Sequence, residues 1–215
     1  MTTTRHTVSD VMTHTAVAIG QEASYKEIVA LMHEWKVSAL PVLAGEGRVV
    51  GVVSEADLLP KEEFRGTEPV LPDELAEAAK AGALLAGDLM SSPAVTVHPA
   101  APVAEAARIM ARKHVKRLPV VNELGLLEGV VSRSDLLKVF LRSDAELAEE
   151  VRTAVVAELA PGAGVEVAVR EGVVTLRGGR GDSALLGLLA RAVRAVEGVV
   201  DVGVSAGPVP PGAPV

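Results

Sequence analysis

Cysteine is absent from this chain of 215 residues, and aromatic residues make up only 2% of it. The first absence excludes disulfide bonds, a thiolate nucleophile and cysteine-ligated zinc. The second absence leaves Val, Leu, Ala and Ile to build the core, which favours tightly packed layers over large aromatic pockets. No apolar run reaches the ~18–20 residues that a membrane-spanning helix needs.

Basic residues are also scarce, with 21 Lys and Arg against 28 Asp and Glu and a net charge of −7. Broad nucleic-acid binding needs a basic face that displaces counterions, so nucleic acid is not an expected partner. The sequence has no P-loop, nucleophile elbow or histidine pair at metal-ligand spacing, and we do not expect an enzyme. We interpret the isolated histidines as exposed surface residues without a partner: His6, His14, His33 and His98.

The first ten residues are polar and contain no apolar signal core. A secretory signal would need such a core, so we expect a cytoplasmic protein. Peripheral association with the inner face of a membrane is compatible with this expectation.

What the chain does contain is an internal repeat at a fixed offset, in which Asp10 corresponds to Asp88 and Asp57 to Asp135. Residues 8–59 align with residues 86–137 without a gap, and 19 of the 52 aligned pairs are identical. A gapless duplication predicts one small unit built twice, whose apolar faces pack against each other. The interface between the two repeats is therefore the first place to look for a site.

Each repeat predicts the order strand, helix, strand, strand, helix. In the first repeat we expect a strand over 16–19, a helix over 25–36, strands over 40–43 and 49–53 joined by a glycine turn, and a helix from 54–57 onward. Ser24 is the expected cap of the first helix, with Glu27 at capping-box spacing. The second repeat predicts a strand over 95–97, a helix over 103–113 and strands near 118–121 and 127–131.

The pattern changes after Leu141. Residues 144–159 predict a helix with Leu147, Val151, Val155 and Leu159 on one face, followed by strands over 165–169 and 174–176, a helix over 182–196 and a strand over 199–204. Together with a Pro-rich linker over 60–72 and a helix over 73–85, this gives five parts. They are residues 1–61, the linker and helix 62–85, residues 86–143, residues 144–206 and a disordered tail 207–215.

Both repeats carry glycine, two valines, serine, two further residues and aspartate where a strand meets a helix. The motif runs from Gly51 to Asp57 and from Gly129 to Asp135. This part of the chain resembles a tandem pair of CBS domains (the cystathionine-β-synthase type), whose signature has a second Ser/Thr directly before the aspartate. The second copy fits fully, whereas the first has Ala56 at that position. The resemblance implies an α+β or α/β fold in which two CBS domains form a pseudo-twofold pair.

The motif chemistry suits a nucleotide. An ionised aspartate can accept both hydroxyls of a ribose, and an adjoining helix N-terminus favours phosphate. CBS domains bind adenosine-containing ligands in the clefts of the pair, so the resemblance implies AMP, ADP or ATP as a regulatory ligand, with NADH or S-adenosylmethionine as further candidates. The same Ser-x-x-Asp spacing also occurs at ordinary helix caps, and that interpretation stays open.

The candidate ligand-binding residues come from both copies. In the second copy they are Thr96, His114, Lys116, Arg117, Ser132, Arg133, Ser134 and Asp135, and in the first Val17, Ser54 and Asp57.

The two copies differ in charge. The basic segment before the second Leu-Pro-Val strand has Lys36, Ser38 and Ala39 as its counterparts in the first repeat. Because a phosphate needs compensating cations, we expect the second copy to bind it better, and Asp135→Ala to weaken binding more than Asp57→Ala. Alternatively, Lys116 and Arg117 are solvated charges on the surface and bind no phosphate.

The C-terminal domain resembles a BON domain, through alternating valines at 165–169, Gly172, the run 174–178 and the ending 196–202. This resemblance implies contact with phospholipid surfaces or partner proteins. On one face, its arginines would attract anionic lipid headgroups, and scattered solubilising charge is the alternative. They are Arg170, Arg177, Arg180, Arg191 and Arg194.

These patterns favour a regulatory protein, in which a CBS pair senses an adenosine nucleotide and a BON domain docks on a membrane surface or partner protein. The alternative is a structural interaction module that binds no ligand. In either case we expect a homodimer, because the helix face with Leu31, Met32 and Trp35 is larger than one small sheet can cover.

Overall fold

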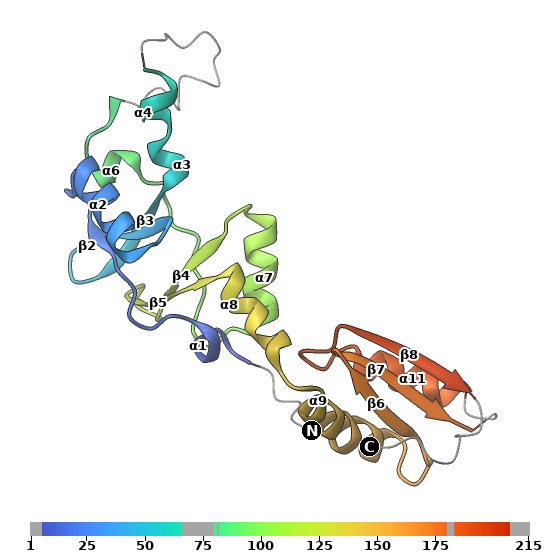
Figure 1. Cartoon of the computed structure of the whole chain (residues 1–215). Helices are drawn as coiled ribbons and strands as arrows, with labels where there is room; N and C mark the ends of the chain where they lie inside the picture. The colour runs from blue at the N-terminus through green and yellow to red at the C-terminus, as the bar shows by residue number, and fades with distance from the viewer. Residues whose placement is uncertain (1–5, 66–79, 81, 180–182, 207–215) are drawn as a thin grey trace. The chain divides into compact units, whose positions relative to one another are not determined.

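The structure is a computed structural model that describes residues 6–65, 80, 82–179 and 183–206 (Figure 1). It contains two compact units. One is formed by Thr7–Arg133, and the other by the residues from Ser134 onward together with His6. Most of the predicted linker and of the helix over 73–85, and the predicted tail over 207–215, lie outside the described residues.

The first repeat has the predicted element order. It contains β1 (Ile19–Gly20), α2 (Tyr25–Trp35), β2 (Ala39–Ala44), β3 (Arg48–Ser54) and α3 (Glu55–Leu58). Helix α2 begins at the predicted cap, where Glu27 N–H donates to Ser24 Oγ. Strand β1 is shorter than predicted because it pairs with β2 only from Ile19 to Gly20. Two short helices were not predicted, α1 (Val8–Val11) and α4 (Pro60–Glu63), the latter inside the predicted linker.

The second repeat follows the same plan. It contains α6 (Ala86–Leu89), α7 (Val103–Arg112), β4 (Arg117–Val121), β5 (Leu127–Ser132) and α8 (Arg133–Leu136). Strands β4 and β5 are antiparallel, as are β2 and β3. The predicted strand over 95–97 is reduced to a single parallel bridge from Val97 to Val120, the counterpart of the Ile19–Val42 pair in β1 and β2.

Backbone bridges join the two repeats symmetrically. Thr13 bridges Val130, and their counterparts in the other repeat, Ser91 and Val52, bridge each other. The Ser24–Leu85 bridge likewise has the Thr7–Pro102 bridge as its counterpart. Arg48 forms a bridge with its own counterpart, Leu126. Each of these bridges is therefore matched when the two repeats are interchanged. A twofold axis between the repeats produces this pattern.

The bridges exchange the first segment of each repeat. Ala86 and Leu89 of α6 belong by sequence to the second repeat, yet both are fully buried in the core of the first. They pack there with residues such as Ile28, Leu40 and Val53. Each repeat therefore depends on the other to complete its core, as the duplication predicted.

The second unit contains the predicted small α+β domain. A helical segment, formed by α9 (Asp144–Glu150), a π-helical turn η2 (Val151–Val156) and α10 (Ala157–Leu159), precedes β6 (Glu166–Arg170), β7 (Val173–Gly178), α11 (Ser183–Val193) and β8 (Asp201–Ala206). The sheet order is β6-β7-β8, antiparallel and then parallel. The core includes Val174, Leu176 and Leu189.

The π-helical turn corrects one part of the predicted helix face. Leu147, Val151 and Val155 are buried as predicted, but Leu159 is 42% exposed and Ala160 is buried. An α-helix would keep Leu159 in line with Val155, whereas the wider π-helical turn changes the angle of every residue that follows. The buried face therefore shifts by one residue at the end of the helix.

We expect Gly129→Ala to destabilise the protein through the bridge between the repeats. A Cβ at this position would lie 2.6 Å from the backbone oxygen of Thr13, which cannot move without opening the Thr13–Val130 bridge. The expected loss in the free energy of unfolding is about 1–3 kcal/mol, the range for overpacking. Urea denaturation measures it, with Gly20→Ala as the control because its Cβ would meet nothing within 4 Å. Equal stabilities for the two variants would contradict the exchanged arrangement.

Candidate functional site: a cavity shared by the two repeats

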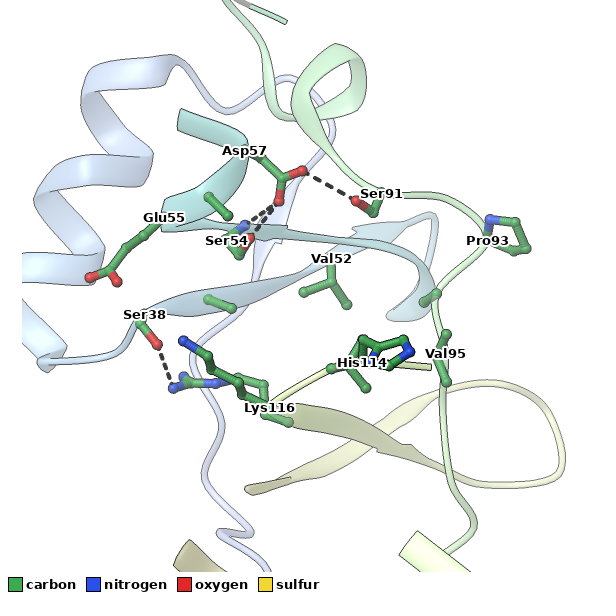
Figure 2. Close-up of a pocket in the computed structure, with 15 residues that line it drawn as sticks. Ser38, Val52, Ser54, Glu55, Asp57, Ser91, Pro93, Val95, His114 and Lys116 are labelled. Carbon is green, nitrogen blue, oxygen red and sulfur yellow. Dashed lines mark hydrogen bonds between the residues drawn. The ribbon is translucent and has the colours of Figure 1, made fainter. Parts of the chain in front are cut away.

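A cavity of about 270 Å³ lies within the Thr7–Arg133 unit, and both repeats line it (Figure 2). The first repeat contributes the start of β2 and the end of β3 with the first turn of α3, and the second contributes two loops. The lining residues are Ser38, Ala39, Val52, Ser54, Glu55, Ala56, Asp57, Ser91, Pro93, Ala94, Val95, His114, Val115, Lys116 and Arg117.

Asp57 is the buried carboxylate of this cavity, with 8% of the residue exposed. Its Oδ2 accepts hydrogen bonds from the Ser54 N–H (2.9 Å) and from the Ser54 hydroxyl (2.6 Å). Its Oδ1 accepts from Lys80 Nζ and from the Ser91 hydroxyl at 3.2 Å. A carboxylate has about four lone-pair positions, so these four donors already occupy Asp57.

The capping interpretation of Ser-x-x-Asp therefore holds for the first copy, because Asp57 accepts from the N-cap residue Ser54. A ribose hydroxyl would have to take the place of one of the four donors. The Ser91 hydroxyl is the weakest competitor, since its contact is the longest of the four.

Burial and hydrogen bonding have opposite effects on the ionisation of Asp57. Burial alone would raise the pKa of Asp57, but the hydrogen bonds from Lys80 and Ser54 and the positive charge of Lys80 together lower it below its ordinary value. The carboxylate is therefore ionised and acceptor-only at neutral pH, as ribose binding needs. Lys80 was not among the predicted site residues.

The exchanged segment of the second repeat forms one wall. Val52 of β3 and Ser91 exchange two backbone hydrogen bonds, of 3.1 and 2.9 Å. This pairing directs the chain that follows, with Pro93 and Val95, along the first repeat, and it places the Ser91 hydroxyl beside Asp57 (Figure 2). The wall is apolar, and a flat aromatic base could pack against it.

The cations of the second repeat face the motif of the first. His114, Lys116 and Arg117 line the cavity with Asp57, and Figure 2 shows His114 and Lys116 on the side opposite Asp57. Arg117 Nη2 donates to the hydroxyl of Ser38 at 2.7 Å, which links the two repeats. The sequence-based ranking grouped these cations with Asp135. In the structure they line the cavity that holds Asp57.

The remaining predicted residues do not line this cavity. Asp135 forms an ion pair with Lys138 at 2.8 Å, and Arg133 Nη2 donates to the backbone oxygen of Val115 at 3.2 Å. Val17 packs against the core of the first repeat. The others outside the cavity lining are Thr96, Ser132 and Ser134.

Several lining residues were missed by the sequence analysis, among them Ser38, Val52, Ser91 and Pro93. A signal for them existed in the repeat itself, since Ser91 is the counterpart of Thr13 at the start of the duplicated stretch. Recognising it would have required knowing that the first segments are exchanged.

In the second unit, the arginines do not share one face. The register of the sheet places Arg170 and Arg177 on its outer face, with Arg177 opposite Glu166 and Arg170 in one row with Val173 and Asp201. Arg191 belongs to α11, in the helical layer, and Arg194 follows directly after that helix. Arg180 lies outside the described residues. This arrangement corresponds to the alternative of scattered charge.

His6 and Glu197 form an unpredicted contact in the same unit. Glu197 Oε2 accepts a hydrogen bond from the His6 backbone N–H at 2.7 Å and lies 2.9 Å from His6 Nδ1. Arg142 donates to the backbone oxygen of Glu197 and to Glu150 Oε2. The expectation that His6 has no partner is therefore wrong.

Two repeats that exchange their first segments around a shared cavity define a class of paired small domains. The sequence matches the CBS domain family over residues 8–61 and 86–142, and the BON domain family over residues 143–206. The chain belongs to the CBS domain family, and its CBS pair is followed by a BON domain. The described residues include no helix long and apolar enough to cross a membrane.

Relatives share the CBS part. The chloroplastic CBS domain-containing protein CBSX2 of Arabidopsis thaliana is 29% identical over 153 residues, which cover 64% of this chain and 64% of CBSX2. The inosine-5'-monophosphate dehydrogenase of Korarchaeum cryptofilum is 34% identical over 148 residues, which cover 67% of this chain and 26% of the enzyme. The chain thus spans less than two thirds of either relative.

Solved structures share the fold. A crystal structure of CBSX2 in complex with AMP has a TM-score of 0.57 at 29% identity, covering 63% of this chain and 97% of that chain. The CBS pair of MJ0100, in complex with 5-methylthioadenosine and S-adenosyl-L-methionine, has a TM-score of 0.51 at 19% identity, covering 63% of this chain and 96% of that chain. At that identity the second likeness concerns the fold alone.

We expect Asp57→Asn to remove part of the acid sensitivity of folding. Because the pKa of Asp57 is lower in the folded chain, its ionised form stabilises the fold above the ordinary value of 3.8, and this contribution is lost as the pH falls through the folded pKa. Urea denaturation between neutral and acidic pH should show wild type and Asp57→Asn converging as the pH falls. Lys80→Met should also reduce the change in the free energy of unfolding with pH. If the free energy of unfolding of both variants differed from that of wild type by the same amount at every pH, this role of Asp57 would be contradicted.

Proposed function

We propose that the CBS pair is a sensor that binds an adenosine nucleotide, AMP in the simplest case, in the cavity at Asp57. The observation that carries this proposal is the order of chemical groups across the cavity. The carboxylate of Asp57 with its hydroxyl neighbours lies at one side, Val52 lies in the middle, and His114 and Lys116 lie at the other side (Figure 2). Arg117 also lines the cavity. These groups suit a ribose, a base and a phosphate.

In this proposal, side-chain cations hold the phosphate and the helix N-terminus contributes little, because α3 has only four residues. The AMP complex of CBSX2, at 29% identity over nearly the whole of that chain, supports AMP as the first ligand to test. ADP, ATP, NADH and S-adenosylmethionine complete the panel. The proposal reverses the order of affinity expected for the two copies from the sequence. Asp57→Ala should weaken nucleotide binding more than Asp135→Ala.

A purely structural dimerisation module is the second candidate, and two observations favour it. The four donors of Asp57 leave its carboxylate fully used within the protein. The outer face of α2 exposes Val29 and Trp35, with 54% of Trp35 accessible, which would suit association with a second copy. This candidate predicts a homodimer whose melting temperature none of the five ligands raises. A sensor instead gains about 2.7 kcal/mol at a ligand concentration 100 times its Kd.

We expect Lys116→Gln to weaken AMP binding about tenfold or more while leaving adenosine binding within about twofold. A hydrogen bond to a charged group contributes roughly 1.5–3 kcal/mol, and only AMP carries the phosphate that Lys116 would meet. Calorimetry with both ligands measures the difference.

Lys113→Gln is the matched control, because Lys113 is an exposed lysine in the same segment and does not line the cavity. An equal loss for AMP in the two variants, or an equal loss of AMP and adenosine in Lys116→Gln, would contradict a phosphate contact at Lys116.

For the BON domain we propose docking on a partner protein. Its arginines lie in both layers, and the sheet arginines share rows with Glu166 and Asp201, so attraction to an anionic surface is weak. We expect the full-length protein not to sediment with vesicles that contain anionic phospholipid, even at low salt. Sedimentation that needs anionic lipid and is reversed by salt would show instead that the BON domain docks on membranes.

A further inference from the structure

A second cavity, of about 600 Å³, borders the first inside the same unit. Ser38, Glu55 and Arg117 line both cavities. The second cavity extends from this shared border along the last turn of α2. Its remaining lining residues are Val29, Met32, His33, Lys36, Val37 and Leu58.

The charged groups of the second cavity suit an anion. Lys36 and Arg117 contribute two positive charges, and the imidazole of His33 adds a hydrogen-bonding group. Glu55 is the one acidic residue in its lining. His33 and Lys36 are specific to the first repeat, because their second-repeat counterparts are Ala111 and His114.

Arg117 connects the two cavities. Its guanidinium donates to the Ser38 hydroxyl at 2.7 Å, and both residues lie on the shared border. A phosphate held by Lys116 and Arg117 in the first cavity would therefore lie next to the entrance of the second. Any further phosphates of the same ligand would pass Ser38 toward Lys36 and His33.

We infer that the second cavity is a subsite for the distal phosphates of an adenosine di- or triphosphate, with Lys36 as its principal cation. This subsite rests on the proposed function, because it extends the nucleotide site at Asp57. Glu55 opposes the added negative charge, so the gain from each further phosphate is smaller than the two cations alone would give.

The test compares ATP with AMP on the full-length protein by calorimetry. In Lys36→Gln, which removes the charge and keeps a polar side chain, we expect ATP affinity to fall about tenfold and AMP affinity to stay within about twofold. Lys26→Gln, in the helix that ends directly before Lys36, is the matched control, because Lys26 is exposed and lines neither cavity. It should change neither affinity. Thermal melting of the three proteins without ligand checks that Lys36→Gln is folded.

The outcomes separate this subsite from the proposed function. If wild type binds AMP but Lys36→Gln loses no ATP affinity, or loses AMP and ATP affinity equally, the subsite is wrong and the Asp57 site remains. If wild type binds AMP and not ATP, the subsite is also wrong. If wild type binds neither nucleotide, the proposed function fails and the subsite fails with it.

Discussion

The reciprocal pairing of Ser91 with Val52 and of Thr13 with Val130 is the interaction on which the rest of the CBS pair depends. It gives each repeat the first segment of the other, and it buries Ala86 and Leu89 in a core to which they do not belong by sequence. A repeat separated from its partner would expose this core. The cavity therefore exists only in the pair.

The charge in the cavity also comes from both repeats. The carboxylate and its hydroxyl partner Ser54 come from the first repeat, whereas Lys116 and Arg117 come from the second. Opposite charges on opposite sides of a cavity suit a ligand that is polar at both ends. Because the two sides belong to different repeats, a ligand that contacts both would favour one relative orientation of them, which is how binding could become a signal.

Much of the fold could be predicted from the sequence because it follows from local patterns. The capping box at Ser24 and Glu27 fixes the start of α2, and the turn at Glu171 and Gly172, both with positive φ, joins the two predicted strands β6 and β7. The shift of the buried face from Leu159 to Ala160 could not be predicted, because a regular α-helical spacing does not include the π-helical turn. Of the site, the sequence identified Asp57, Ser54, His114, Lys116 and Arg117, but it assigned the last three to the second copy. Their combination depends on pairing between distant segments, as does the contact of Lys80 with Asp57.

The central claim is that one adenosine nucleotide binds between the repeats, at Asp57 of the first and the cations of the second. A crystal structure of the full-length protein grown with AMP tests it most directly. The account predicts the ribose at Asp57, the base against Val52 and Val95, and the phosphate at Lys116 and Arg117. AMP bound at Asp135 instead, or an empty Asp57 cavity in crystals grown at saturating AMP, would contradict it.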